Sequence, residues 1–125
     1  MICTAKEILS GLWIGGPDIF KNQQFNLEKN IDLNINCETT QFNCNYLYKT
    51  TKFIHKNLNI LKNILVCCNN SQKSETLITA YLIRYAKIKI DGSISIIKSK
   101  KPTAFNRGIY YKKLLLQFEN NIKYL

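Results

Sequence analysis

The residues of this chain that could do chemistry gather at positions 66–74, which read Val-Cys-Cys-Asn-Asn-Ser-Gln-Lys-Ser. The apolar pair Ile64 and Leu65 precedes them, and positions 75–83 follow with apolar residues at helical spacing. A cysteine between a strand and a helix, with a lysine six positions later, is typical of a site where a thiolate meets a phosphate. Backbone N–H groups at a helix N-terminus attract an oxyanion and lower the pKa of a nearby thiol.

The elements that must position this segment follow from hydrophobic periodicity. A buried strand at 64–67 leads into the segment, and a helix at 74–87 follows it. Further strands are predicted near 8–14 and 33–37, with a less regular one near 45–48. Because strands alternate with helices, we predict an α/β domain with a central, mainly parallel sheet flanked by helices, and a ligand site beyond the carboxyl ends of the strands.

The other helices are predicted at 22–30, around 53–61, from Asp91 as the cap to Pro102 as the stop, and from about 107 towards 123. His55 is expected to be exposed on the second of these. Each helix is expected to turn an apolar stripe inwards. The stripes are Phe25 and Leu27; Phe53, Ile54, Leu58 and Leu61; Leu77, Ile78, Tyr81 and Leu82; Ile94 and Ile97; and Ile109, Leu114, Leu115 and Phe118.

The segment at 66–74 resembles the signature loop of the cysteine-dependent protein phosphatases, in particular the small dual-specificity phosphatases. Their loop has a His-Cys pair, five further residues and an Arg followed by Ser or Thr. With Cys67 at the nucleophile position, Lys73 falls on the arginine, Ser74 falls on the hydroxyl, and the helix at 76–82 matches as well. With Cys68 there instead, these helix matches are lost. We therefore predict the Cys67 register.

The resemblance extends over nearly the whole chain, in the order and spacing that the family shows. It implies one dual-specificity-phosphatase-like domain at 1–125. The further segments that carry it are 12–16, 34–37, 53–54 and 100–119.

Several positions depart from the family pattern. Lys73 keeps the positive charge of the arginine but lacks its planar fork, so it would bind phosphate as a point charge. Val66 stands in place of a histidine, and Asn70 in place of a glycine, although Asn tolerates positive φ well. The aspartate loop of the family is predicted to be deleted, and Glu38 is the only acid between positions 37 and 67 that could replace its general acid.

The resemblance and these departures together predict a divergent phosphatase-family protein that binds phosphate and has little activity. Losing a general acid costs on the order of 10²–10⁴ in rate. Cys67 would be the vestigial nucleophile, Lys73 the phosphate cation and Ser74 the residual hydroxyl. The phosphate-binding loop would comprise Cys68, Asn69, Asn70, Ser71, Gln72 and Lys73.

Two alternatives remain open at this stage. One is a slow cysteine phosphatase that acts on phosphotyrosine, phosphoserine or phosphothreonine in proteins. The other is a protein that binds RNA 5′-phosphates, since the net charge of +10 favours polyanions. A phosphorylated protein is the expected partner, and the oligomeric state is not specified by the sequence.

Length and composition limit the classes of protein to which this chain could belong. The length of 125 residues suits one domain, and the five cysteines include no Cys-x2-Cys spacing, so neither a metal nor another cofactor is predicted. No apolar run approaches the length of a membrane span, and the first residues lack the order of a signal peptide. We expect an intracellular protein with reduced thiols, cytoplasmic or nuclear. The richness in Lys, Asn and Ile also fits an AT-rich gene, which leaves open a viral protein in a host cell.

Overall fold

The computed structural model describes residues 5–16, 19 and 22–123. Within them the strands and helices alternate through most of the chain. Their order is β1 (Lys6–Leu9), β2 (Leu12–Gly15), α2 (Gln23–Glu28), β3 (Ile31–Asn36), α3 (Cys44–Asn59), β4 (Asn63–Cys67), α4 (Ser71–Tyr85), α5 (Ile90–Lys100) and α6 (Lys112–Ile122). The predicted α/β class is confirmed.

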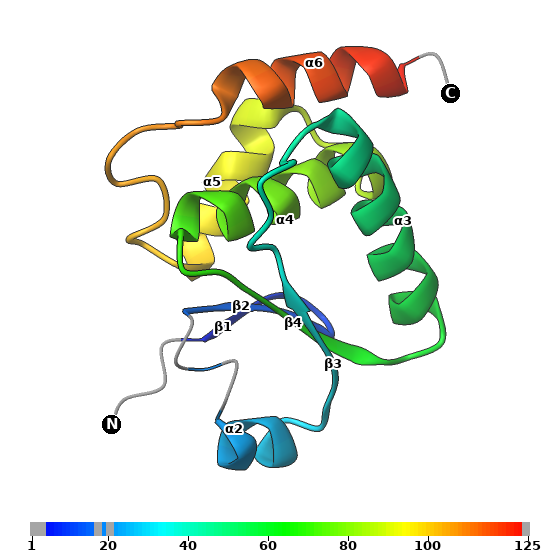
Figure 1. The fold of residues 1–125 in the computed structure, drawn as a ribbon, viewed down its shortest axis with the longest axis vertical. Helices are drawn as coiled ribbons and strands as arrows, with labels where there is room; N and C mark the ends of the chain where they lie inside the picture. Colours follow the sequence, from blue (N-terminus) through cyan, green and yellow to red (C-terminus); the bar gives the residue numbers. More distant parts are fainter. Residues whose placement is uncertain (1–4, 17–18, 20–21, 124–125) are drawn as a thin grey trace.

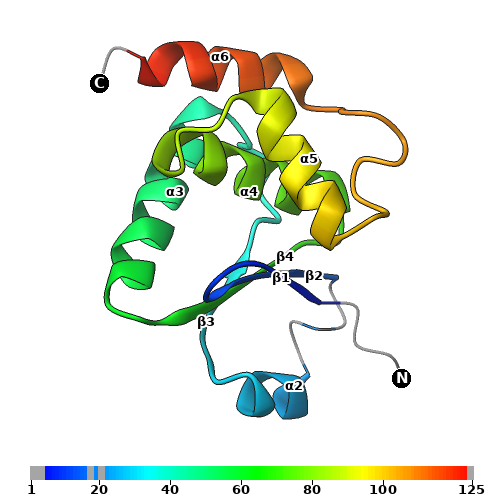
Figure 2. The ribbon, with the colours of Figure 1, turned by 180° about the vertical axis from the view of Figure 1, so that it is seen from behind.

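The strands form one sheet in the order β1-β2-β4-β3. β4 is central and runs parallel to both β2 and β3, while β1 adds an antiparallel edge. Helices α3, α4, α5 and α6 lie on one side of the sheet and α2 lies on the other (Figures 1 and 2). The sheet is therefore mainly parallel, as predicted, with its central strand leading directly into the segment that carries the chemistry.

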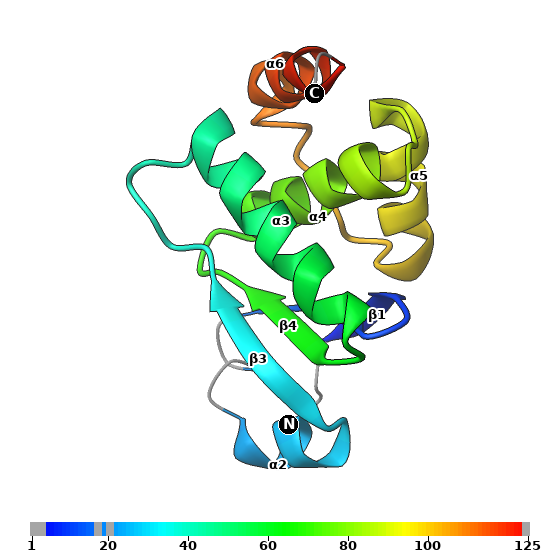
Figure 3. The same cartoon turned by 90° about the vertical axis from the view of Figure 1, so that its right-hand side faces the viewer.

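Helix α4 is the core of the helical layer. It packs on β2 and β4 and also contacts α3, α5 and α6, and Figure 3 shows it between the sheet and α6. Every residue from position 74 to 83 is buried, so the helix is covered on all sides rather than along one stripe. The predicted burial of Leu77, Ile78, Tyr81 and Leu82 is confirmed.

Two of the predicted strands differ in the structure. The run at 8–14 is a hairpin, because Gly11 turns the chain at φ +84° and its N–H donates to Glu7 Oε2 at 3.0 Å. The predicted strand at 45–48 is wrong, since these residues form the first turn of α3. Asn43 caps that turn by accepting from Tyr46 N at 2.9 Å, and this cap outweighs the strand preference of the aromatic residues that follow.

Three of the predicted helices begin at different residues in the structure. α4 begins at Ser71 rather than 74, because the Asn70 side chain accepts from Gln72 N at 2.9 Å. The N-cap of α5 is Lys89, and Asp91 lies in the first turn instead. α6 begins at Lys112 rather than near 107, after a segment in which Gly108 has a φ of +96°.

The burial predictions hold for most of the apolar stripes, but three residues are wrong. Leu27, Phe53 and Leu61 are exposed, Leu61 by 90%. The buried face of α3 runs through Leu47, Thr51 and Ile54, so Phe53 lies to one side of it. Leu61 follows the end of α3 in a left-handed turn at φ 63° and points to solvent.

His55 is another difference. It is half-buried rather than exposed, and its ring stacks on Tyr85 with the centroids 3.8 Å apart.

Candidate functional site

The candidate site lies at the carboxyl end of β4, where the chain turns into α4. In a parallel sheet this end is where ligands bind. Positions 68–70 form the turn, and Lys73 N donates to Asn70 O at 3.0 Å as the helix starts. The predicted strand–loop–helix arrangement is therefore present, with Asn70 as the cap of α4.

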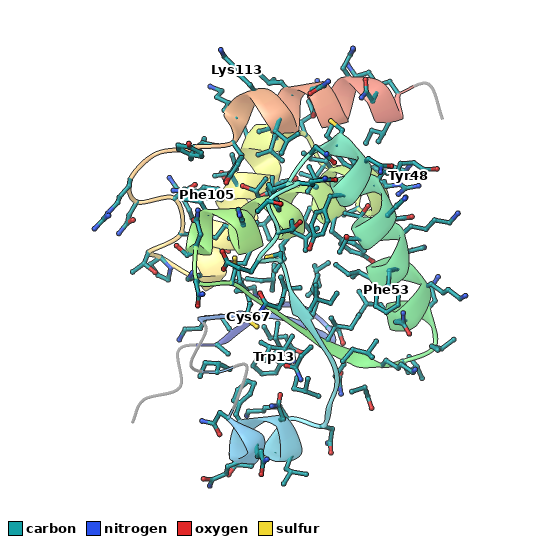
Figure 4. The ribbon with its side chains drawn as sticks, in the orientation of Figure 1. Trp13, Tyr48, Phe53, Cys67, Phe105 and Lys113 are labelled. Carbon is teal, nitrogen blue, oxygen red and sulfur yellow. The ribbon has the colours of Figure 1, made fainter. Side chains whose placement is uncertain are left out.

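Cys67 is the last residue of β4 and is only 1% exposed. Side chains alternate along a strand, so Cys67 shares a face with Leu65, which packs in the small cluster with Phe25 of α2. Its Sγ lies 3.8 Å from Ile35 O of the neighbouring strand. Figure 4 shows Cys67 at the level of the sheet. Burial raises the pKa of its thiol to about 12.

Cys68 is the thiol on the other face, within the main core cluster on the side of α4. Its Sγ donates to Glu38 Oε2 at 3.2 Å. Burial and this hydrogen bond raise the pKa of the Cys68 thiol, whereas the backbone N–H of Asn70 and the side chain of Cys37 lower it. Cys68 is thus the cysteine whose sulfur contacts Glu38, the carboxylate that lies against the loop.

Glu38 follows the end of β3 and reaches across to the loop. Its Oε2 accepts both from Cys68 Sγ and from the backbone N–H of Asn69, the latter at 3.0 Å. The Cys68 hydrogen bond, the Asn69 N–H and the charge of Lys73 all lower the pKa of the Glu38 carboxyl. A carboxylate therefore already sits on part of the predicted N–H cradle.

Lys73 lies in the first turn of α4, close to this carboxylate. Its Nζ donates to Thr39 O at 2.8 Å and lies 5.9 Å from the centroid of the Phe42 ring. The lysine predicted to bind phosphate thus has a backbone carbonyl as its partner. The segment at 38–39 contacts both the N–H and the ammonium group of the site.

The remaining predicted residues are spread around the loop. Ser74 is buried, and its hydroxyl donates to Ser71 O at 3.0 Å within the helix. Asn69, Asn70 and Ser71 are exposed. Gln72 bonds twice to the chain before α6, with Nε2 donating to Gly108 O at 2.9 Å and Oε1 accepting from Tyr110 N at 3.3 Å. The structure brings Cys68, Lys73 and Glu38 together, whereas Cys67 and Ser74 turn away from them.

Glu75 is an important residue that the sequence reasoning missed. It is 2% exposed, forms an ion pair with Lys101 Nζ at 2.8 Å, and accepts from Phe105 N at 3.1 Å. Together with Gln72 it holds the segment at 101–110 against the start of α4. The signal that could have found it is a glutamate within positions 74–83, a stretch that is otherwise apolar or hydroxylic.

Among positions 5–16, 19 and 22–123, no group of three His, Cys, Asp or Glu side chains is placed to hold a metal ion. In the same part of the chain, no helix has the length and apolarity needed to cross a bilayer.

Comparisons with known proteins agree with this arrangement. The family model for the dual specificity phosphatase catalytic domain matches residues 17–121. No curated protein sequence matches the chain significantly. One similar structure is a mouse putative dual specificity phosphatase complexed with zinc tungstate, with 19% identity and a TM-score of 0.83, over 99% of this chain and 91% of that chain.

Two human structures are also similar. Human DUSP28 has 16% identity and a TM-score of 0.80, over 98% of this chain and 97% of that chain. The human tyrosine phosphatase-like serine/threonine/tyrosine-interacting protein has 15% identity and a TM-score of 0.74, over 96% and 95%. At these identities the structures show a shared fold. Because the family model spans most of the chain, the protein belongs to the dual-specificity phosphatase family.

Proposed function

We propose that this protein binds phosphorylated proteins through the loop at 67–73 and hydrolyses phosphate esters at no appreciable rate. The observation that carries the proposal is the docked carboxylate of Glu38. An oxyanion group is held by the Asn69 N–H and lies within the field of Lys73. A phosphoryl group offers the same kind of oxygen acceptor with more charge, so it suits the same donors.

The protonation of the two thiols argues against efficient catalysis. The nucleophile of a cysteine phosphatase is a thiolate, but the pKa of Cys67 is about 12 and that of Cys68 is also raised. Neither thiol is therefore substantially ionised at neutral pH. Lys73 supplies charge without the bidentate grip of an arginine, which weakens the stabilisation of the transition state.

The ionisation of Glu38 supports the same conclusion. Glu38 is the residue that could replace the missing general acid, but the lowered pKa of its carboxyl keeps it ionised at neutral pH. It therefore has no proton to give to a leaving oxygen. Loss of general acid catalysis costs on the order of 10²–10⁴ in rate, so efficient hydrolysis of a phosphotyrosine ester is not expected.

The roles of individual residues are part of this proposal. Lys73 is the cation, and the N–H groups of the loop form the cradle. Cys67 remains the predicted vestigial nucleophile by register, although its sulfur lies on the α2 side of the sheet. The geometry favours Cys68 as the sulfur that faces a bound anion, because its Sγ donates to the same Glu38 oxygen that accepts from Asn69 N.

The proposal is tested by measuring phosphopeptide binding and turnover of an activated aryl phosphate in the same samples. Wild type, Cys67→Ser and Cys68→Ser are compared. We expect saturable binding in all three proteins and negligible turnover. Measurable turnover that disappears in either serine variant would instead establish a slow cysteine phosphatase, and absence of binding in all three would refute the proposal.

The slow phosphatase stays as the second candidate because of the surroundings of Cys68. The backbone N–H of Asn70 lowers the pKa of the Cys68 thiol and so favours the thiolate, although burial keeps that pKa raised overall. If Glu38 leaves the loop when a substrate enters, Cys68 also loses a hydrogen bond that favours its neutral form. Turnover by wild type that is lost in Cys68→Ser would favour this candidate over binding alone.

A further inference from the structure

The segment Glu38 and Thr39 contacts both charged features of the phosphate-binding loop. The Glu38 carboxylate accepts from Asn69 N at 3.0 Å, and the Thr39 carbonyl accepts from Lys73 Nζ at 2.8 Å. These are the donors that a phosphoryl group would use. One short stretch of the chain therefore competes with a ligand for an N–H group and for the ammonium group at once.

The competition with Glu38 is both steric and electrostatic. A phosphoryl oxygen cannot accept from Asn69 N while Glu38 Oε2 occupies that position. The negative charge of Glu38 also repels a phosphate dianion at close range, since charges a few ångströms apart interact strongly near a protein surface. An anion therefore binds only as Glu38 withdraws.

The structure allows this withdrawal by rotation of a side chain alone. Glu38 is exposed, so its carboxylate can exchange the loop for water. The backbone beneath it is fixed, because Glu38 N donates to Asn36 Oδ1 at 3.0 Å and Cys37 N donates to Cys67 O at 3.1 Å. Leaving the loop requires no change in the pairing of β3 with β4.

We propose that Glu38 is an internal carboxylate ligand of the loop, which a phosphate monoester displaces when it binds. The inference rests on the proposed function, and it adds which ligands are accepted. A monoester dianion can outcompete a single carboxylate for Asn69 N–H and Lys73. A sulfate ester or a phosphodiester, with one negative charge, gains less from the exchange and is discriminated against.

The experiment compares the affinities of wild type, Glu38→Gln and Glu28→Gln for phenyl phosphate and phenyl sulfate, by calorimetry at constant ionic strength. Glu28 is an exposed glutamate of α2 that pairs with Gln24, so its variant removes the same charge far from the loop. We expect Glu38→Gln to bind phenyl phosphate roughly tenfold more tightly. Glu28→Gln should bind like wild type, and wild type should favour phenyl phosphate over phenyl sulfate.

The outcomes separate the inference from the proposed function. Equal or weaker binding of phenyl phosphate by Glu38→Gln, with clear binding by wild type, would overturn the inference and leave the proposed function standing. Equal gains in both glutamine variants would reduce the effect to net charge and would also overturn it. No binding by any of the three proteins would refute the proposed function and, with it, the inference.

The amide resonance of Asn69 gives a second measurement. In ¹⁵N spectra, Glu38→Gln and saturation of wild type with phenyl phosphate should both move this resonance strongly, because each removes the carboxylate from its N–H. A resonance that stays in place when phenyl phosphate binds would show that the ligand leaves Glu38 on the loop. That result would overturn the inference.

Discussion

Two glutamates of this protein make nearly the same hydrogen bonds, but one is a fixed part of the fold and the other can be displaced. Glu75 accepts from Phe105 N and pairs with Lys101, and Glu38 accepts from Asn69 N near Lys73. Glu75 is 2% exposed, whereas Glu38 lies open to solvent. Burial makes the first carboxylate irreplaceable in the folded state, while exposure lets water or a ligand replace the second.

The largest expected effect is that of Glu75→Ala. Removing one partner of a buried pair leaves Lys101 and the Phe105 N–H without their acceptor, so we predict a loss of about 3–5 kcal/mol in the free energy of unfolding. Urea denaturation of Glu75→Ala and Glu38→Ala checks this, and the second variant should lose far less. Similar losses in both variants would contradict the contrast between the two glutamates.

Lys73→Ala tests the cation of the exposed site. We expect the affinity for phenyl phosphate to fall roughly tenfold or more, because a charge-assisted hydrogen bond is lost. The control is Lys49→Ala, which removes an exposed charge from α3. Unfolding should change little in either variant, and an equal loss of affinity in both would mean that the lysine acts only through net charge.

The two adjacent cysteines are expected to differ in reactivity. With a pKa of about 12, Cys67 is ionised in only about one molecule in ten thousand at pH 8, against about one in ten for an ordinary thiol of pKa 9.0. Iodoacetamide should therefore modify Cys68 before Cys67, and Cys67 only as the pH rises. Mass spectrometry of peptides resolves the order of modification. Faster modification of Cys67 would contradict the burial of its sulfur against the sheet.

The smallest effect concerns the pH dependence of stability. The pKa of Glu38 is lower in the folded protein than its ordinary value of 4.5, so its contribution is present above about pH 4.5 and is lost as the pH falls through the folded value. We predict that wild type melts slightly above Glu38→Gln at pH 7 and that the difference closes at lower pH. A constant difference would mean that the carboxylate is not held by the loop.

The sequence was informative where structure is specified locally. The apolar run before Cys67 and the helical spacing after Ser74 predicted β4 and α4. The resemblance to a family then predicted the order of the other segments. The prediction of a strand near 45–48 was wrong because the Asn43 cap starts a helix there. The last helix was predicted to begin too early because Gly108, with a positive φ, interrupts the helical conformation before α6.

The details of the site depend on contacts between distant positions, which periodicity does not contain. Glu38 meets Asn69 only because β3 pairs with β4 in a particular register. Cys67 and Cys68 lie on opposite faces of the sheet because successive side chains of an extended chain point in alternating directions. The spacing of a motif does not show which face each cysteine takes. The pairing of Glu75 with Lys101 likewise needs α4 and α5 to be packed together.

The most direct test of the central claim is one NMR titration of the wild-type protein with phenyl phosphate, recording the amide resonances at 69–73 and the release of phenol in the same tube. We predict that the loop resonances shift and saturate, that of Asn69 most strongly, while phenol stays undetectable over hours. Unshifted loop resonances, or phenol released steadily from a saturated loop, would contradict a site that holds phosphate without efficiently hydrolysing it.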